Sequence, residues 1–382
     1  MHAQRNKIKR ISLFACVLFL GFLGYWEYKT QEYNWDMIPY MAVVLMNESN
    51  NIDEVHHVVY KTIKEQVPAG DYQLLIYGNV EMRKKSAESA DYFKKQLPFY
   101  VVKPLYTRLV YWFYKMGFPL IKATVLPSVI CYFFIGIVLY TWLSKYLNTI
   151  ASLLIVLLLM IYKPFLAIGN ISTPDCLSAL ILLIVFYFLA ERKSLGLIFG
   201  LLAVAVFARL DNVIPAIAVL ILLRFSAKWK TQLSNRQFFF AGLVICVCYL
   251  FVAFKARPFG WNILFYPSFL SHLNPTYNSS IPFSFSAYSS VVQTQIFDKM
   301  AYSELPIFFL LAMALLFDRN SSKLTDYSFE RMLVGAVLLI IITRFLLQPI
   351  IADRFYVAYY ATIFLLLVKR LVLKFELASK SI

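Results

Sequence analysis

The sequence predicts an all-α protein: a polytopic transmembrane helical bundle of about 10 spans, with a long external loop that carries amphipathic surface helices. Two observations predict this class. Of the 382 residues, 60% are hydrophobic and only 15% are charged, whereas soluble domains are nearer one half apolar and one quarter charged. The apolar residues also gather in runs that suit membrane helices, which satisfy their own backbone hydrogen bonds in hydrocarbon.

Ten apolar ranges are candidate spans, although several are shorter than the ~20 residues that cross a bilayer without tilt or a break. They cover residues 11–26, 119–142, 147–168, 173–190, 195–209, 212–225, 237–254, 304–317, 332–350 and 355–374. Four basic residues at positions 5–10 precede the first range, and no small-residue cleavage site follows it. This pattern predicts an uncleaved anchor with a cytoplasmic N-terminus, and ten spans then leave the C-terminus cytoplasmic as well.

The loops on the predicted cytoplasmic side are rich in Lys and Arg, as the positive-inside rule requires. They contain Lys145, Arg192, Lys193, Arg224, Lys228, Lys230, Arg236, Arg319, Lys323, Arg331, Lys369, Arg370 and Lys374. Lys163 is the exception, near the outer end of the third range. The net charge of +16 therefore reflects membrane orientation, and we expect no nucleic-acid partner.

Five parts follow from these spans. They are an N-terminal anchor span (1–26), an external loop with juxtamembrane helices (27–118), a transmembrane core (119–254), a second external loop (255–303), and C-terminal transmembrane helices with a short cytoplasmic tail (304–382). Apolar residues recur every three or four positions between Ile52 and Val67, and again between Leu105 and Met116. Each pattern predicts a helix lying along the membrane surface, or alternatively a small packed subdomain without lipid contact.

Two acids at the external side of spans are candidates for catalysis. Asp36 lies between Trp35 and Met37, about ten residues beyond the first range, and Asp175 follows Thr173-Pro174 at the start of the fourth. A partly desolvated carboxylate beside aromatic rings is suited to accept a proton. Asp175 could bind a metal or orient an acceptor hydroxyl. Either acid could instead cap a helix.

Several cations gather on the same external side. Arg209 stands in Arg209-Leu210-Asp211-Asn212 between two apolar ranges, where a charge costs about 2.5–3.5 kcal/mol at a helix centre and therefore faces a cavity or a partner. It could hold a phosphate, or pair locally with Asp211. The other candidates for lipid-phosphate contacts are Lys103, Arg108, Arg257 and Arg354. Each could also be an interface anchor, but their number on an external face favours an anionic ligand.

Some catalytic signatures are absent from the sequence. It contains no GxxxxGK[ST] phosphate loop, no GxGxxG turn, no Asp-x-Asp pair and no Gly-x-Ser-x-Gly nucleophile elbow. An external enzyme without a nucleotide-binding motif would need an activated substrate that arrives through the membrane, such as a lipid phosphate.

The layout resembles the GT-C superfamily of membrane glycosyltransferases. The likeness covers roughly residues 1–225 and rests on Asp36 after the first span, Lys103-Pro104-Leu105-Tyr106 at the end of the first loop, Thr173-Pro174-Asp175, and Arg209-Leu210-Asp211-Asn212. The chain is short for that group and has no C-terminal soluble domain.

The resemblance implies hexosyl or pentosyl transfer from a polyprenyl-phosphate sugar to a glycan, lipid or protein acceptor of the cell envelope, on the extracytoplasmic face of the cytoplasmic (inner) membrane. Asp36 would be the general base, with Asp175 as a second catalytic acid. Arg209, Arg257 or Arg354 would stabilise the departing lipid phosphate. A divalent metal, Mg²⁺ or Mn²⁺, could share that task, with Asp175 as one ligand. Membrane lipids are further expected partners.

Two other functions remain open. A polysaccharide polymerase or ligase would use the same external face but take an oligosaccharide-diphosphate lipid as donor. A transporter would place polar residues or broken helices near the bilayer midplane, usually in repeated halves. No repeated halves are visible in this sequence, and its charges gather at the outer surface.

Overall fold

The computed structural model is built from helices, as the composition predicts. The structure describes residues 2–78, 81–191, 193–230, 232–257, 260–261, 265, 269, 282–318 and 327–379. Within these ranges no β-strand forms, and an isolated parallel bridge joins Glu32 to Ile171. The all-α class is therefore confirmed for the described part of the chain.

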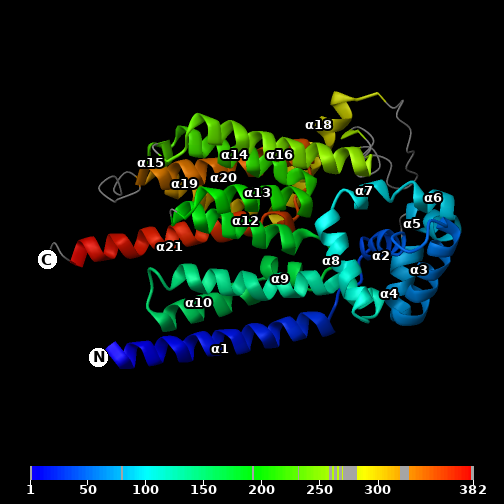
Figure 1. The fold of residues 1–382 in the computed structure, drawn as a ribbon, viewed down its shortest axis with the longest axis horizontal. Coiled ribbons are helices and arrows are strands. Elements are labelled where there is room, and N and C mark those ends of the chain that lie inside the picture. Colours follow the sequence, from blue (N-terminus) through cyan, green and yellow to red (C-terminus); the bar gives the residue numbers. More distant parts are fainter. Residues whose placement is uncertain are drawn as a thin grey trace.

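The helices of the main bundle run side by side along the length of the molecule (Figure 1). They are α1 (His2–Lys29), α9 (Leu120–Leu143), α10 (Thr149–Ile161), α12 (Asp175–Ala190), α13 (Leu195–Ala208), α14 (Val213–Phe225), α16 (Asn235–Ala256), α19 (Leu305–Phe317), α20 (Tyr327–Leu347) and α21 (Val357–Ser379). Short connecting elements are α11 (Lys163–Gly169), η1 (Leu210–Asn212), α15 (Ala227–Lys230), α18 (Phe285–Thr294), η3 (Gln295–Lys299), η4 (Met300–Tyr302) and η6 (Asp353–Phe355).

A second group of helices covers one end of this bundle (Figure 1). It contains α2 (Met37–Leu45), α3 (Ile52–Gln66), α4 (Ala69–Tyr77), α5 (Glu81–Glu88), α6 (Ala90–Lys94), α7 (Pro98–Val101) and α8 (Pro104–Lys115). Helix α1 begins, and helix α21 ends, at the opposite end of the bundle. The predicted first external loop is thus a helical cap on the end far from both termini.

Each of the ten apolar ranges contains a helix of the bundle. Among the described residues, three helical segments are long and apolar enough to cross a membrane: Lys7–Lys29, Leu120–Leu143 and Asn235–Ala256. Two bent pairs raise this number to five if each pair counts as one span; they are α10 with α11, at 67°, and Phe285–Tyr302 with α19, at 88°. The structure therefore supports three to five crossing helices, and ten spans stay a prediction.

The third apolar range is not one continuous helix, contrary to the single span predicted for 147–168. Helix α10 ends at Ile161, and Tyr162 has extended backbone, with φ −69° and ψ 135°. Pro164 follows in the first turn of α11. The two backbone features together explain the bend, because a proline fits the first turn of a helix but cannot continue one.

Exposed apolar stripes run along three of the bundle helices. On α10, four large side chains are at least half exposed at intervals of three or four residues: Ile150, Leu154, Leu158 and Ile161. Comparable stripes are Ile11, Phe14, Leu18 and Phe22 on α1, and Phe239, Phe240, Leu243, Val247, Leu250, Phe251 and Phe254 on α16. Exposed apolar surface of this extent marks contact with a membrane or a partner.

The two amphipathic helices predicted in the first loop are present as α3 and α8, but they use their apolar faces differently. On α3, Val55, Val59 and Ile63 are buried inside the protein. This helix therefore packs its apolar face in a subdomain, as the alternative proposed, and that face is not free to contact lipid. On α8, Trp112 and Met116 remain exposed, so this helix retains an apolar surface outside the core.

Candidate active site

The start of α12 is held by hydrogen bonds from α9 and from the end of α1. Gln31 donates from Nε2 to the Ser172 hydroxyl at 3.2 Å, and the hydroxyls of Thr124 and Ser172 lie 2.8 Å apart. Ser128 donates to the carbonyl oxygen of Thr173 at 3.1 Å. Because these five side chains are buried or nearly so, the segment that precedes Asp175 is fixed in place.

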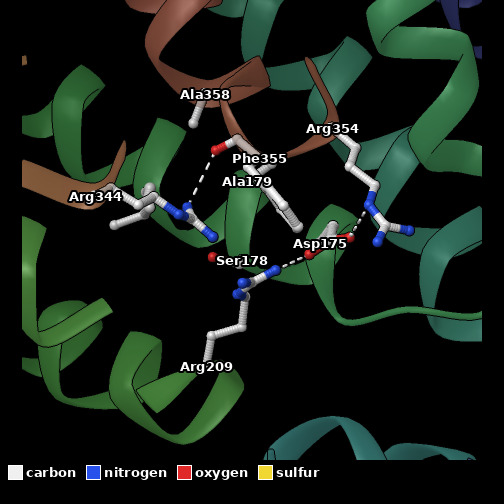
Figure 2. A pocket seen from close by; sticks show the side chains of 9 residues that line it. Asp175, Ser178, Ala179, Arg209, Arg344, Arg354, Phe355 and Ala358 are labelled. Atoms are coloured by element: carbon white, nitrogen blue, oxygen red, sulfur yellow. Dashed lines mark hydrogen bonds and ion pairs between the residues drawn. The ribbon is translucent and has the colours of Figure 1, made fainter. Parts of the chain in front are cut away.

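Asp175 is the most buried acid of the candidate site, with 4% of the residue exposed. Asp175 is the first residue of α12, and the N-cap residue is Pro174; the Asp175 Oδ2 accepts a hydrogen bond from the Thr173 hydroxyl at 2.9 Å. Oδ1 is paired with Arg209 Nη1, and Oδ2 lies 3.4 Å from Arg354 Nε. Figure 2 shows these two arginines approaching the carboxylate from different sides. The capping alternative is therefore wrong for Asp175.

Arg209 lies at the junction between α13 and α14. It ends α13 in extended conformation, and the 3₁₀ turn η1 then leads into α14. The side chain of Asn212 secures this junction, since its Nδ2 donates to the Ala205 carbonyl at 2.8 Å and to the Ser178 hydroxyl at 2.9 Å. The local geometry directs Arg209 towards Asp175 on α12 (Figure 2).

Arg209 also pairs with Asp211, as the sequence alternative proposed. Its Nε and Nη2 donate to the two oxygens of Asp211, each at 3.0 Å. The same carboxylate is 2.8 Å from Nη2 of Arg344 on α20. Burial alone would raise the pKa of Asp211. The positive charges of Arg209 and Arg344 lower it by more than burial raises it, so the pKa lies well below its usual value. Arg209 thus joins two carboxylates, and the local pair is one part of a larger network.

Three guanidinium groups surround the ring of Phe355 in η6. The central carbons of Arg209 and Arg344 lie 4.8 Å from the ring centroid, and that of Arg354 lies 5.0 Å away. Arg344 also donates to the Phe355 carbonyl at 3.2 Å (Figure 2). Because an aromatic face attracts cations, this ring allows three positive charges to gather in a small volume.

Asp36 faces the same network from the cap. Asp36 is the N-cap residue of α2, but its side chain accepts no hydrogen bond from the backbone of that helix. The helix-capping alternative is therefore wrong here too. The Asp36 Oδ1 accepts a hydrogen bond from the Tyr100 hydroxyl at 3.1 Å, and Oδ2 lies 3.7 Å from Arg354 Nη2. The Asp36 side chain is 32% exposed and that of Arg354 is 34% exposed. Arg354 therefore bridges Asp36 at the open rim to Asp175 at the buried floor.

Lys103 adds a fourth cation next to Asp36. Its ammonium lies 5.0 Å from the ring centroid of Tyr100 and 5.5 Å from that of Tyr40, and it donates to the Phe99 carbonyl at 2.8 Å. Burial lowers the pKa of Lys103 to about 8, although the charge of Asp36 opposes this shift. The ammonium is therefore close to its titration point near neutral pH.

The network, defined here as the ion-pair site, has more cations than anions. Among the described residues, Lys103, Arg209, Arg344 and Arg354 face three carboxylates, those of Asp36, Asp175 and Asp211. A cavity of about 10 Å³ lies between the arginines, Asp175 and Phe355, which is room for a single water molecule. A larger ligand would enter from the rim, where Asp36 and Arg354 are partly exposed.

The chemistry of the ion-pair site does not fit a divalent metal. Each of its three carboxylates is already engaged by a guanidinium group. Within the described ranges, no group of three or more His, Cys, Asp or Glu residues is placed to hold a metal ion. A divalent cation would add charge to a cluster that is already cationic, whereas an anion would balance it.

The structure brings together Asp36, Lys103, Asp175, Arg209 and Arg354 of the predicted residues, but not Arg108 or Arg257. Arg108 lines a separate cavity between α2, α8 and α16. Arg257 is exposed at the C-cap of α16 with φ 43°, and no ion pair among the described residues joins it to the ion-pair site. The expectation that all the external cations share one site is therefore too broad.

Two residues of the site were missed by sequence reasoning. Arg344 could have been found, because a lone cation within the apolar range 332–350 needs a buried partner to offset its cost. Tyr100 could not have been found in this way, since a tyrosine in a predicted loop carries no charge that would require a buried partner. Its role depends on how α7 packs near α2.

Similarity to other proteins gives no assignment of function. The chain matches no protein-family model, no curated protein and no solved structure.

Proposed function

We propose that this chain is a membrane glycosyltransferase of the GT-C type, which transfers a sugar from a polyprenyl-phosphate donor to a cell-envelope acceptor. One observation carries the proposal: Arg354 links the partly exposed Asp36 to the buried Asp175 in a cluster with surplus positive charge. A carboxylate beside an anion-binding group is what this transfer needs. The carboxylate takes a proton, and the cations receive a phosphate.

In the proposed reaction, Asp36 is the general base. An acceptor hydroxyl gives its proton to Asp36 while its oxygen forms a bond to the anomeric carbon of the donor sugar. The bond between that carbon and the phosphate oxygen breaks, and the lipid phosphate leaves with both electrons. This single displacement inverts the anomeric centre and leaves the proton on Asp36.

The cations of the ion-pair site stabilise the departing phosphate. Arg354 contacts its two carboxylates at 3.4 and 3.7 Å, longer than the 2.7–2.9 Å of a strong charge-assisted hydrogen bond. Its guanidinium group therefore keeps donors for a phosphate. When Arg354 turns to the donor, Asp36 is released from this ion pair and is free to accept the proton. Donor binding and base activation are coupled in this way.

In the proposed membrane arrangement, the ten bundle helices span the bilayer and the cap lies on the extracytoplasmic side. Helix α13 has 14 residues and α14 has 13, so each extends only about 20 Å, less than the ~30 Å of hydrocarbon. Their junction at Arg209 would then lie below the outer membrane surface, at a depth that a lipid phosphate can reach.

This topology predicts opposite accessibility for two single-cysteine variants. Lys64 is exposed on α3 in the cap, and Lys193 is exposed between α12 and α13. In right-side-out vesicles, a membrane-impermeant maleimide is expected to label Lys64→Cys, and to label Lys193→Cys only after permeabilisation. The unmodified chain, with its five natural cysteines, gives the background. Equal labelling of both positions in sealed vesicles would contradict the arrangement.

The direct test of function uses purified protein in vesicles with radiolabelled polyprenyl-phosphate hexoses and pentoses. We expect labelled sugar to pass to a cell-envelope acceptor fraction and the free polyprenyl phosphate to accumulate. A parallel reaction with an oligosaccharide-diphosphate lipid identifies the polymerase or ligase alternative. Transfer from that lipid alone, or from neither donor, would refute the proposal.

Donor binding is expected to weaken as the pH rises through about 8. Lys103 is charged below its pKa of about 8 and neutral above it, so the ion-pair site loses one positive charge in this interval. Between about pH 7 and about pH 9 the Kd of the donor should rise about tenfold, as expected for one titrating group. Lys103→Arg keeps its charge over this range, and binding to this variant should not change. An equal rise in Kd for both proteins would contradict the role of Lys103.

A further inference from the structure

A second cavity lies between α2, α8 and the end of α16, outside the ion-pair site. Its volume is about 280 Å³, against about 10 Å³ for the cavity of the ion-pair site. Most of its lining is apolar, including side chains from all three helices and from α7. The lining residues are Val43, Met46, Asn47, Val101, Pro104, Thr107, Arg108, Phe251, Val252, Lys255 and Ala256.

Two cations from different helices meet at this cavity. Arg108 comes from α8 and Lys255 from the last turn of α16, and both are exposed. No Asp or Glu is among the lining residues in the described part of the chain. This differs from the ion-pair site, where carboxylates neutralise most of the positive charge. Two cations in a cavity whose described lining holds no carboxylate attract a doubly charged anion.

The apolar part of the cavity continues onto the exposed stripe of α16. Phe251 lines the cavity with 55% of its surface exposed, and Phe254, one turn further along the helix, is 77% exposed. Helix α16 is one of the three helices long and apolar enough to cross a membrane. A ligand with its head group between Arg108 and Lys255 could therefore extend a hydrocarbon chain along this helix.

We propose that this cavity binds a phosphomonoester lipid, with the phosphate between Arg108 and Lys255 and the chain against α16. A phosphomonoester carries a charge of about −1.5 to −2 near neutral pH, which matches two cations. A phosphodiester lipid carries only one negative charge. The lipid released in the proposed transfer is also a phosphomonoester. The identification of the bound lipid with this product rests on the proposed function, whereas the proposal that the cavity binds a phosphomonoester lipid does not.

The position of the cavity separates it from the reacting groups. Asp36 precedes the first residue of α2, whereas Met46 and Asn47 follow its last. This helix has nine residues and extends about 13 Å. A phosphate held by Arg108 is therefore not the phosphate that departs beside Asp36. Lys103 and Pro104 connect the two places, because Lys103 belongs to the ion-pair site and Pro104 lines the cavity.

The test measures lipid binding to the full chain in zwitterionic nanodiscs by native mass spectrometry. The probes are polyprenyl phosphate, the neutral polyprenol and the diester lipid phosphatidylglycerol. We expect polyprenyl phosphate to bind most tightly, and the double variant Arg108→Gln with Lys255→Gln to bind it about tenfold more weakly or worse. Met46→Trp, which fills part of the cavity, should also weaken binding.

Lys115→Gln is the matched control, because it removes a cation from the same helix α8 outside the cavity. Asp36→Asn and Arg354→Gln should bind polyprenyl phosphate at this cavity as the unmodified chain does, even if transfer is lost. Binding that is unchanged in the double variant, or equally strong for polyprenol, would refute the site. Competition by millimolar inorganic phosphate as strong as that by the lipid would show a free-phosphate site instead.

Discussion

Asp36→Asn is expected to lower the rate of sugar transfer by about 10²- to 10⁴-fold, the usual contribution of a general base. Asparagine keeps the size of the side chain and can still accept a hydrogen bond from Tyr100, but it cannot take a proton from the acceptor hydroxyl. The measurement is the initial rate of transfer from a purified polyprenyl-phosphate sugar at saturating donor. The loss should appear in kcat rather than in donor affinity.

The stability of Asp36→Asn should stay close to that of the unmodified chain. The Asp36 carboxylate is about one third exposed, and its ion pair with Arg354 is long, at 3.7 Å. Such pairs contribute about 0–1 kcal/mol. Asp53→Asn, which removes an exposed carboxylate on α3 of the same cap, should keep full activity. Full activity of a well-folded Asp36→Asn protein would remove Asp36 from the role of base.

Much of the helical fold could be predicted from the sequence, because apolar runs and helix-ending residues act locally. Each apolar range contains a helix, and α3 ends next to Pro68 as its apolar pattern predicts. The bend between α10 and α11 was missed, although it has a local sign: Lys163, the one exception to the charge rule, begins α11. What an apolar helix face contacts was less predictable, since the sequence pattern of α3 is compatible with contact to lipid and with contact to protein.

The composition of the site was only partly predictable, because it depends on packing between distant helices. The cost of charge among apolar residues identified Arg209, and position at span ends identified Asp36, Asp175 and Arg354. Charge cost and span position place residues on one face of the protein, but they do not give the distances between those residues. They therefore grouped Arg108 with these residues, whereas the structure puts it at another cavity. Only coordinates show that Arg354 reaches two carboxylates.

The largest effect on stability is expected at the buried pair between Arg209 and Asp175. Arg209→Met should lower the free energy of unfolding by about 3–5 kcal/mol, the usual cost of removing one partner of a buried ion pair. Asp175 is 2% exposed at its side chain and would keep the 2.9 Å hydrogen bond from Thr173 and the 3.4 Å contact with Arg354, its one remaining cation among the ion pairs of the described residues. Asp211 would lose two hydrogen bonds of 3.0 Å and keep Arg344. Reversible unfolding in mixed micelles measures this change.

A double-mutant cycle separates loss of the pair from loss of packing. When Asp175→Leu is combined with Arg209→Met, no unpaired charge remains at that contact, and buried ion pairs replaced by apolar residues are often no less stable. The double variant should therefore be destabilised by less than the sum of the two single variants. Lys115→Gln breaks an exposed pair with Glu48 and should leave stability nearly unchanged. Additive effects of the two site substitutions would mean that Arg209 and Asp175 do not interact in the folded protein. The hydrogen bond between Asn212 and Ser178 would then remain as a contact between α12 and the junction of α13 and α14, without the ion pair beside it.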